Sequence, residues 1–600
     1  MTIGARWGMA ALATLLLGAT DEPAASPIRF DQVGFEADGP KRFAIETTAP
    51  VDWTLRTEAG DAVANGSAKP VPDAGSDQSV ATVTIDRHLA PGRYTLAANG
   101  VVSRPIIVAE RPFAALFRDA MSFFYQQRAG IPILAAHVQR PDLARPAGHS
   151  HEVATCFTGT DTLGVVWPGC NAKVDVTGGW YDAGDRGKYV VNAGISVWTL
   201  LNAYERAHGG ALMHDGVLAL PEAGNAVPDL LDEARYEIDW MLRMQIPAGT
   251  RVAVLAADGR GTRMIEGGGL AWHKVADTHW AALPLRVEDD HATRALYPPS
   301  TAATLNLAAV AAQAARIWRT IDPAFARRCL DAAIRAYAAA AREPALFADA
   351  RFTGSGGYGD RTVADEAYWA AAELAITTGD ANAVAALSQS PFGARGAPGA
   401  IGWGDTATLG AISLLSVRSN VPADLIAVQR RALLAGADRL LADDAAQPYR
   451  FPAASGDTQW GSNGALLDRA VLLGTAYDLT GRVEYRTAVT DALDYVLGRN
   501  PLDRSYVSGY GVRPMRNPHH RFWGHGIDPS FPLPPPGVLS GGPNSVAMTD
   551  PVAAAMKGRC RPLTCWSDDA RAFTQNEVAI NWNAPLVWVA AFLDDTRGRR

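Results

Sequence analysis

The hydrophobic periodicity of the chain changes once, near residue 112, and this change limits the folds that the chain can adopt. Between about residues 27 and 110, apolar and polar residues alternate, as in 81–85 and 94–98, and turn signals such as Ala-Pro-Gly at 90–92 separate the runs. This pattern predicts short antiparallel strands, and about eighty such residues fit one small immunoglobulin-like β-sandwich. From Pro112 onward the period is about 3.6 residues, which predicts helices as far as the C-terminus.

The helical part of the chain contains eleven predicted segments. They are expected at 113–124, 190–207, 227–242, 302–319, 324–342, 363–378, 406–417, 422–442, 463–480, 483–498 and 574–595. A ring of antiparallel helix pairs needs an even number of helices, and a solenoid of helical hairpins is the alternative. The segments show no repeat of roughly 34 to 47 residues, and long loops rich in Gly, Trp, His and Pro connect them, which favours the ring.

The N-terminus has the composition of a signal peptide. Arg6 precedes an apolar run of about thirteen residues, 7–19, which is too short to span a bilayer. We therefore expect residues 1–25 to be removed on export to the periplasm or the medium, a sandwich over 26–110 and a helical domain over 111–600. No other stretch is long and apolar enough to predict a membrane span in the mature protein.

Charge and cysteine content narrow the choice of partners and compartment. The chain has 55 Lys and Arg against 62 Asp and Glu, a net charge of −7, so it lacks the basic surplus expected of a nucleic-acid-binding protein. The spacing of the five cysteines predicts two local disulfides, Cys156 with Cys170 and Cys560 with Cys565, and Cys329 lies in a helical pattern as a buried thiol. Metal ligation is the alternative for the first pair.

The first concentration of reactive side chains is residues 178–189, which read Gly-Gly-Trp-Tyr-Asp-Ala-Gly-Asp-Arg-Gly-Lys-Tyr. Asp182 and Asp185 lie three residues apart across an Ala-Gly pair, so both carboxylates can converge on one water or one cation. A turn with two solvated acids is the structural alternative.

Two further concentrations follow near the C-terminus. Glu577 lies among apolar and amide neighbours at the start of the last predicted helix, where low polarity raises a carboxyl pKa toward the value that a general acid needs. A first-turn acid that stabilises the helix dipole is the alternative. Residues 506–521 combine paired histidines with arginines in a Gly/Pro loop, which can bind a polyhydroxyl ligand or a carboxylate. A metal site or a plain loop is the alternative. Because all three loops lie between helices, one cleft can gather them.

At these residues the chain resembles glycoside hydrolase family 9, the cellulase family with a six-fold α-hairpin barrel. The family's DAGD element is present at 182–185, its histidine signature at 511–521, and its acidic signature from Trp566-x-Asp568 through Glu577-x-Ala579 to Asn583-Ala584, all in family order. The similarity covers roughly 112–595, and residues 28–35 resemble the start of the immunoglobulin-like module that precedes the barrel in many members. The resemblance implies a mainly α protein, an (α/α)6 barrel catalytic domain preceded by a small β-sandwich.

The resemblance also assigns roles to individual residues. Asp185 matches the catalytic base, Asp182 its partner in holding the nucleophilic water, and Glu577 the acid that protonates the leaving glycosidic oxygen. The expected substrate-binding residues are His519, Arg521, the signature acid Asp568, and Trp180 and Tyr181 beside the DAGD element. Family members invert the anomeric centre, which requires room for a water between the carboxylates. No cofactor is required for this chemistry.

Metal sites of the family match this chain only in part. Some members bind zinc through two cysteines and neighbouring histidines upstream of the DAGD element, but here Asn171 follows Cys170 and Tyr181 precedes the element, which favours the disulfide over zinc. Calcium is common in the family. Asp360, Asp365 and Glu366 offer oxygen ligands for it, and an acidic helix start without an ion is the alternative.

These expectations combine into an inverting endoglucanase that cleaves β-1,4-glucosidic bonds in cellulose-type glucans or cellodextrins. An exo-acting cellodextrinase, β-glucosidase or glucosaminidase on the same scaffold is the first alternative, because the insert 136–177 is placed to close one end of a cleft. A non-catalytic glucan-binding protein is the alternative from another class. The presence of Asp182, Asp185 and Glu577 together argues against it, since a binding protein gains nothing from a general acid.

Overall fold

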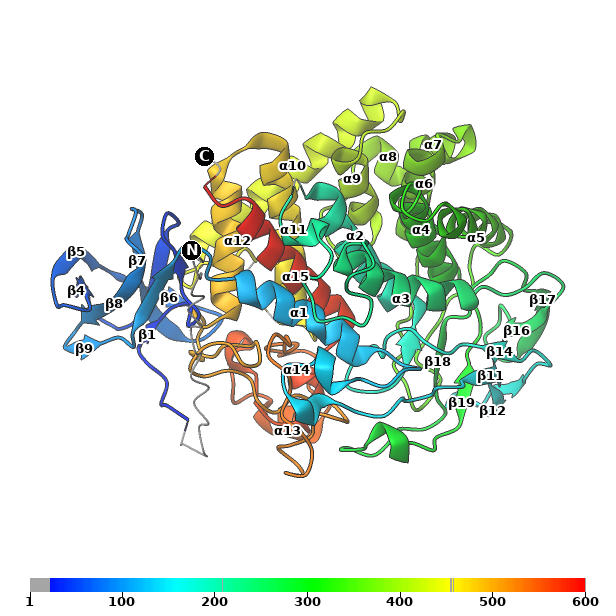
Figure 1. The fold of residues 1–600 in the computed structure, drawn as a ribbon, viewed down its shortest axis with the longest axis horizontal. Helices are drawn as coiled ribbons and strands as arrows, with labels where there is room; N and C mark the ends of the chain where they lie inside the picture. The colour runs from blue at the N-terminus through cyan, green and yellow to red at the C-terminus, as the bar shows by residue number, and fades with distance from the viewer. Residues whose placement is uncertain (1–21, 208, 454–455, 457, 599–600) are drawn as a thin grey trace, which may run out of the picture.

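A computed structural model describes residues 22–598 of the chain, apart from 208, 454, 455 and 457. Most of the predicted signal peptide, residues 1–21, lies outside the described residues. Within the described part no helix is both long and apolar enough to cross a membrane. Figure 1 shows a β-rich N-terminal part at one end of the molecule, beside α12 and the rest of a larger helical part.

The N-terminal part is a sandwich of two sheets that share one hydrophobic core. One sheet has the order β1 (Ile28–Arg29), β3 (Lys41–Glu46), β7 (Gln78–Ile85) and β6 (Pro70–Asp73). The other has the order β2 (Phe35–Glu36), β10 (Ile106–Ala109), β8 (Gly92–Ala98), β4 (Val51–Thr57) and β5 (Ala62–Ala68), with β9 (Val101–Val102) paired to β8. Val83 and Ile85 of β7 face the core while Thr84 is exposed, as the alternation at 81–85 predicts.

Six largely buried helices follow one another in a closed ring. They are α2 (Val190–Arg206), α4 (Thr301–Ile317), α6 (Ala364–Thr378), α9 (Ala407–Ser416), α11 (Ser462–Thr480) and α15 (Ile580–Asp595). Each packs against the next, and α15 packs against α2. Their sequences are apolar or small on nearly every side, which is typical of helices without a solvent face. Gly194 of α2 illustrates the close packing, because a Cβ there would lie 2.2 Å from Asn306 Oδ1 of α4.

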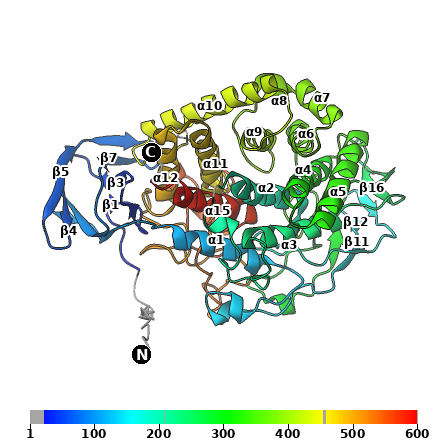
Figure 2. The same ribbon diagram turned by 45° about the horizontal axis from the view of Figure 1, so that its top comes forward.

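Six further helices cover the ring from outside. They are α1 (Ala114–Gln127), α3 (Asp229–Arg243), α5 (Pro323–Arg342), α7 (Ala381–Gln389), α10 (Ala423–Ala446) and α12 (Val483–Val496). In that order they pack on α15, α2, α4, α6, α9 and α11. In Figure 2, α10 runs along the edge of the helical domain, outside α9 and α11. One face of α5 carries the buried residues, including the free thiol of Cys329, as predicted.

Two helical predictions need correction. Helix α7 was not predicted from the sequence; it has nine residues and follows the N-cap Asp380. One helix was predicted over 574–595, but the structure has a short α14 (Phe573–Asn576), an extended segment 577–579, and then α15. Other short helices are α8 (Pro391–Arg395), α13 (Pro551–Met556) and the 3₁₀ turns Ala135–His137, Pro141–Leu143, Ala211–Met213, Val287–Asp289 and Pro562–Thr564.

The long connections between the first helices contain strands that the sequence analysis did not predict, because runs of two to five residues show too little alternation. One sheet has the order β14 (Val174–Asp175), β11 (Val153–Cys156), β19 (Arg294–Leu296), β18 (Lys274–Asp277) and β15 (Lys188–Tyr189). Two hairpins accompany it, β12 (Thr158–Thr160) with β13 (Val166–Pro168), and β16 (Arg251–Leu255) with β17 (Thr262–Glu266). Figure 1 shows these strands at the end of the molecule opposite the sandwich.

Candidate active site

The loop that carries Asp182 and Asp185 connects the strand sheet to α2 and is tied to the start of α15. The backbone N–H of Asp182 donates to the Gly187 carbonyl (2.9 Å), and the Asp182 carbonyl accepts from Ile580 N–H (2.9 Å). Gly184 permits a close approach of a second loop, because a Cβ there would lie 2.0 Å from the His519 carbonyl oxygen. The DAGD element therefore needs glycine at this position.

The histidine loop and the acidic segment meet beside this element. His519 pairs with Glu577 as two extended strands would, and its N–H donates to the Asn576 carbonyl (2.8 Å). The N–H of Arg521 donates to the Gly184 carbonyl (3.0 Å). Three loops from distant parts of the sequence thus converge at one place. Glu577 has an extended backbone, φ −70° and ψ 163°, so the alternative of a first-turn helix acid is wrong.

Asp182 is held by two side chains that the sequence analysis missed. Its carboxylate oxygens accept one hydrogen bond each, from Asn192 Nδ2 (2.5 Å) and from the Tyr358 hydroxyl (2.6 Å). Burial raises the pKa of Asp182 to about 7, while both hydrogen bonds oppose the shift and the charge of Asp185 adds to it. The Asp185 carboxylate accepts from the Gly187 N–H (3.0 Å) and remains partly exposed.

Glu577 is partly exposed and lies in surroundings that favour its neutral form. Burial raises its pKa well above the usual value, the negative charges of Asp185 and Asp182 add to the shift, and the Arg521 guanidinium opposes it. Glu577 can therefore carry a proton at a pH where an exposed glutamate has lost its own. The arrangement can thus supply a proton from Glu577 and a proton acceptor from the Asp182 and Asp185 pair.

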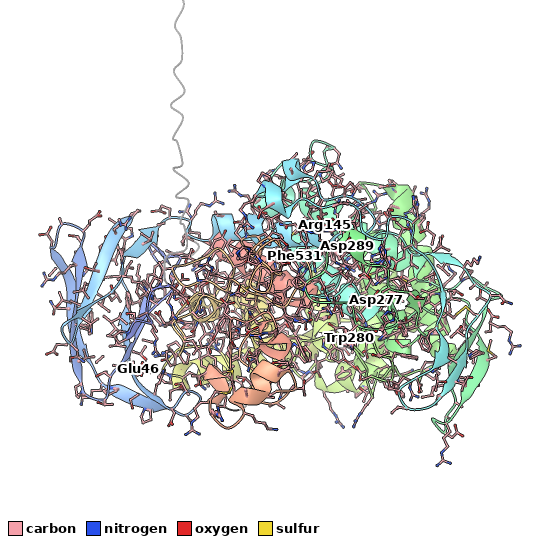
Figure 3. The ribbon with its side chains drawn as sticks, turned by 90° about the horizontal axis from the view of Figure 1, so that it is seen from below. Glu46, Arg145, Asp277, Trp280, Asp289 and Phe531 are labelled. Carbon is pink, nitrogen blue, oxygen red and sulfur yellow. A yellow bond between two sulfur atoms is a disulfide. The ribbon has the colours of Figure 1, made fainter. Side chains whose placement is uncertain are left out.

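All three carboxyl groups line one cavity of about 840 Å³. Its aromatic lining consists of Tyr189, Trp280, Phe352, Tyr358, Trp403, Trp460, Phe573 and Trp582. Trp280 and Trp460 are 54 % and 41 % exposed, so large parts of both rings face solvent. Figure 3 labels Trp280 close to Asp277 in the helical domain, well away from Glu46 of the sandwich. Flat aromatic surfaces with polar groups between them suit a ligand that has apolar faces and hydroxyl edges.

His519 and Arg521 line the same cavity. His519 Nδ1 lies 2.7 Å from the Ala570 carbonyl oxygen, so Nδ1 carries the proton and Nε2 is an acceptor. Burial lowers the pKa of His519 to about 4, and the charge of Arg521 adds to the shift, so the imidazole is neutral. Arg521 Nη1 lies 3.4 Å from His519 Nε2, and Arg521 Nε is buried without a hydrogen-bond partner among the described residues. The two side chains thus border the cavity and contact each other there.

The other three predicted substrate-binding residues do not line the cavity. Trp180 is 1 % exposed, and its indole N–H donates to Glu233 (2.8 Å). The Tyr181 hydroxyl is also buried, 2.6 Å from His149 Nδ1. Asp568 accepts from the backbone N–H groups of Arg516 (3.0 Å) and Asn517 (2.8 Å), so it holds the histidine loop. These three side chains lie outside the cavity lining and hold the segments around it. This position differs from the predicted contact with substrate.

The predicted calcium ligands form a separate acidic cluster. Glu366 is fully buried, and neither of its carboxylate oxygens has a hydrogen-bond partner among the described residues. Burial and the neighbouring charges of Asp365 and Asp360 raise the pKa of Glu366 to about 10. Asp365 accepts from Thr406 N–H (2.8 Å), and Asp405 lies close enough for both Asp360 and Asp365 to raise its pKa. The charges of these four acids act on one another, but their ligand atoms do not come together within 4.8 Å as those of one other group of described residues do.

Both predicted cysteine pairs are joined in the structure. The S–S distances are 1.99 Å for Cys156 and Cys170 and 2.01 Å for Cys560 and Cys565. Nearby, single ligand atoms of His149, Asp277 and Asp290 lie within 4.8 Å of one another. Arg294 pairs with Asp277 and Arg186 with Asp290, so arginines already neutralise both acids and leave little for a metal ion to gain.

Comparison with known proteins agrees with this geometry. The sequence model of glycosyl hydrolase family 9 matches residues 113–590, and that of the cellulase N-terminal ig-like domain matches residues 23–103. These two matches define a catalytic domain of the glycosyl hydrolase type with an accessory sandwich. The chain belongs to glycosyl hydrolase family 9.

Individual relatives match nearly the whole length of this chain. The chain is 42 % identical to endoglucanase C of Cellulomonas fimi over 96 % of its own length and 52 % of that protein, so it spans about half of that relative. It is 37 % identical to cellulose 1,4-beta-cellobiosidase of Acetivibrio thermocellus, over 95 % of this chain and 67 % of the other. The solved structure of AaCel9A with cellobiose-like isofagomine has a TM-score of 0.80 at 32 % identity and covers 95 % of this chain and 100 % of that one.

Proposed function

We propose that the chain is an inverting endoglucanase that hydrolyses β-1,4-glucosidic bonds in cellulose-type glucans or cellodextrins. The observation that carries the proposal is the pair of unlike carboxyl environments in one aromatic cavity, where Glu577 favours its neutral form beside Asp185 and Asp182. The relatives named as an endoglucanase and a cellobiosidase support this substrate class, as does the cellobiose-like ligand of the solved relative.

The proposed reaction follows from the positions of these groups. Glu577 donates its proton to the glycosidic oxygen as the bond from that oxygen to the anomeric carbon breaks. Asp185 removes a proton from a water that Asp182 helps to hold, and the water oxygen attacks the anomeric carbon from the opposite face, which inverts it. Asn192 and Tyr358 fix the Asp182 carboxylate by occupying one lone pair on each oxygen. His519 Nε2 and Arg521 bind sugar hydroxyls.

We propose that the scaffold is an (α/α)6 barrel over 111–600, preceded by an immunoglobulin-like sandwich over 26–110. Six inner helices in a closed ring, each covered by one of six outer helices, support this assignment. The sandwich acts as a support, since Trp53 is its single tryptophan and aromatic rows for binding a glycan are lacking. Residues 1–25 act as a signal peptide, and two disulfides fit the oxidising compartment, the periplasm or the medium, that export would reach.

We also propose a structural calcium ion at the acidic cluster. Glu366 with its two unpartnered oxygens, Asp365, Asp360 and Asp405 together provide hard oxygen ligands, and a cation would remove the cost of burying like charges. The ion would stabilise the start of α6 and takes no part in the chemistry. Thermal unfolding with added calcium tests this assignment, with a rise in Tm that a Glu366→Gln variant lacks as the expected result.

An exo-acting cellodextrinase is the second candidate, because Thr162 from the insert 136–177 lines the cavity and limits its extent on that side. A time course on cellohexaose and carboxymethyl-cellulose separates the two. We expect a rapid fall in viscosity with mixed oligosaccharides as products. Stepwise release of glucose or cellobiose at constant viscosity would instead support the exo-acting enzyme, and the absence of any product would leave the glucan-binding alternative.

A further inference from the structure

The insert that precedes the DAGD element contains a hairpin closed by a disulfide at its base. Strands β12 and β13 pair from Thr158 with Pro168 to Thr160 with Val166, and the bond between Cys156 and Cys170 joins the chain just outside them. We call residues 156–170 the disulfide hairpin. Its tip reaches the catalytic cavity, where Thr162 is part of the lining.

The hairpin tip is fastened to a second segment, residues 349–358, which we call the cavity loop. Both the N–H and the hydroxyl of Thr162 donate to the Arg351 carbonyl, at 2.9 and 2.8 Å. The Arg351 guanidinium lies 3.0 Å from the Asp161 carboxylate, and these two side chains are only 7 % and 0 % exposed. The indole N–H of Trp167 donates to the same carboxylate (3.0 Å). A buried ion pair and two hydrogen bonds to the Arg351 carbonyl thus join the two segments.

The cavity loop forms a large part of the site. Phe352 lines the cavity, and the rings of Phe157 (5.0 Å), Trp167 (5.4 Å) and Tyr297 (4.8 Å) surround it, the first two from the hairpin. The remaining lining residues of the loop are Ala350, Thr353, Ser355, Gly356, Gly357 and Tyr358. The position of these lining residues therefore depends on contacts with the disulfide hairpin.

The two strands of the disulfide hairpin are too short to keep it folded by themselves. Each strand has three residues, and an isolated pair of this length is marginal in water. Leu163 and Val166 are 69 % and 66 % exposed, so part of its apolar surface stays in solvent. The disulfide restricts the open conformations of this segment and so keeps Asp161 and Thr162 within reach of Arg351.

We propose that the disulfide hairpin is a positioning element that fixes the cavity loop and thereby sets the affinity for sugar units bound away from the scissile bond. This inference rests on the proposed glucan hydrolase function. The catalytic carboxyl groups come from other segments, and the last loop residue, Tyr358, which holds Asp182, packs against Tyr189 and Trp403, which lie outside the hairpin. Opening the hairpin therefore weakens the binding of long substrates more than it slows bond cleavage. In kinetic terms, KM for a long oligosaccharide rises while kcat changes little.

The chain provides its own matched control in the second disulfide. We compare the double variant Cys156→Ser/Cys170→Ser with Cys560→Ser/Cys565→Ser, whose bond does not contribute to the cavity lining. For the first variant we expect KM on cellohexaose to rise about tenfold, with kcat within about threefold of the wild type. For the control we expect both constants within about twofold, although either variant can lower Tm. An unchanged KM in the first variant, or an equal rise in both, would overturn the proposal.

A second variant tests the same element without removing the disulfide. Asp161→Asn weakens the contact with Arg351, and we expect KM to rise as in the first double variant, but by a smaller factor.

Hydrogen exchange of residues 349–358 supplies a readout that does not need activity. We expect faster exchange in the first double variant only. If the wild type releases no sugar from cellohexaose, the proposed function fails, and the exchange result still decides whether the hairpin holds the loop. Equal exchange in both double variants would overturn the proposal.

Discussion

Carboxyl groups are buried both in the cavity and at the interface between the sandwich and the helical domain. Only in the cavity can a ligand reach them. At the interface, burial and the charge of Asp494 raise the pKa of Asp31 well above its usual value, and burial raises that of Asp494 to about 6. Asp182 and Glu577 show shifts in the same direction. A raised carboxyl pKa therefore reports burial, and access from a cavity distinguishes the groups that we propose to be catalytic.

The two regions also differ in how their charges are compensated. At the interface Arg499 pairs with Asp494 (2.6 Å), Arg42 pairs with Asp491, and Arg486 holds Glu36 through two contacts of 2.8 and 2.9 Å. Among the described residues that line the cavity, Arg521 is the single arginine or lysine beside three carboxyl groups. Incomplete compensation in the cavity favours the neutral form of Glu577, whereas at the interface the charges of Arg499 and Arg42 oppose the rise in the pKa of Asp494.

The substitution Glu577→Gln should have the largest effect, because it removes the proton donor and leaves the cavity shape intact. We expect kcat on cellohexaose to fall by about 10²–10⁴-fold, the contribution typical of general acid catalysis, with no loss in Tm. Asp31→Asn is the matched control, since it also neutralises a buried acid and should leave kcat unchanged. Equal rates in the wild type and Glu577→Gln would contradict the assigned role.

Gly184→Ala should have the next largest effect. The added Cβ would lie 2.0 Å from the His519 carbonyl oxygen, so the histidine loop must move away from the DAGD element. A displacement of about 1 Å at a catalytic site costs about 10²-fold in rate, and we expect kcat to fall by that order. Gly261→Ala is the control, because a Cβ added at that position would have no atom of another residue within 4 Å. A crystal structure or an activity assay that finds both variants like the wild type would contradict the close approach of the two loops.

The sequence predicted the three converging loops because each carries its signature within a short segment. It predicted eleven of the twelve helices in the ring and its outer layer, and missed α7, whose nine residues give little periodicity. Asn192 and Tyr358 were missed because they reach Asp182 from 10 and 176 residues away, where no local pattern relates them. Trp180 and Tyr181 were misplaced since neighbours of a catalytic residue in the chain can point away from it.

At the interface, Asp31→Asn should raise stability at neutral and alkaline pH. The folded state holds the proton of Asp31 more tightly than the unfolded chain does, so the wild type loses stability as pH rises above the unfolded pKa, about 3.9. Asparagine is uncharged, like the protonated form of Asp31, so the variant avoids this loss of stability. At pH 8 we expect its free energy of unfolding to exceed that of the wild type by about 1–3 kcal/mol. The free energy of unfolding, measured at pH 4 and pH 8, should differ between variant and wild type at pH 8 only. A variant that is less stable than the wild type at pH 8 would show that Asp31 is needed in its charged form.

The smallest effect is expected for Asp77→Asn, which breaks an ion pair on the surface of the same interface. Arg561 lies 2.9 Å from Asp77, but the two side chains are 60 % and 71 % exposed, so water and salt screen the attraction. We expect the free energy of unfolding to change by less than about 0.5 kcal/mol, as for most exposed ion pairs. Asparagine also tolerates the left-handed backbone of this residue, φ 63°, so no strain is added. A change as large as that of Asp31→Asn would mean that exposed contacts, and not the buried carboxyl and arginine groups, hold the sandwich to the helical domain.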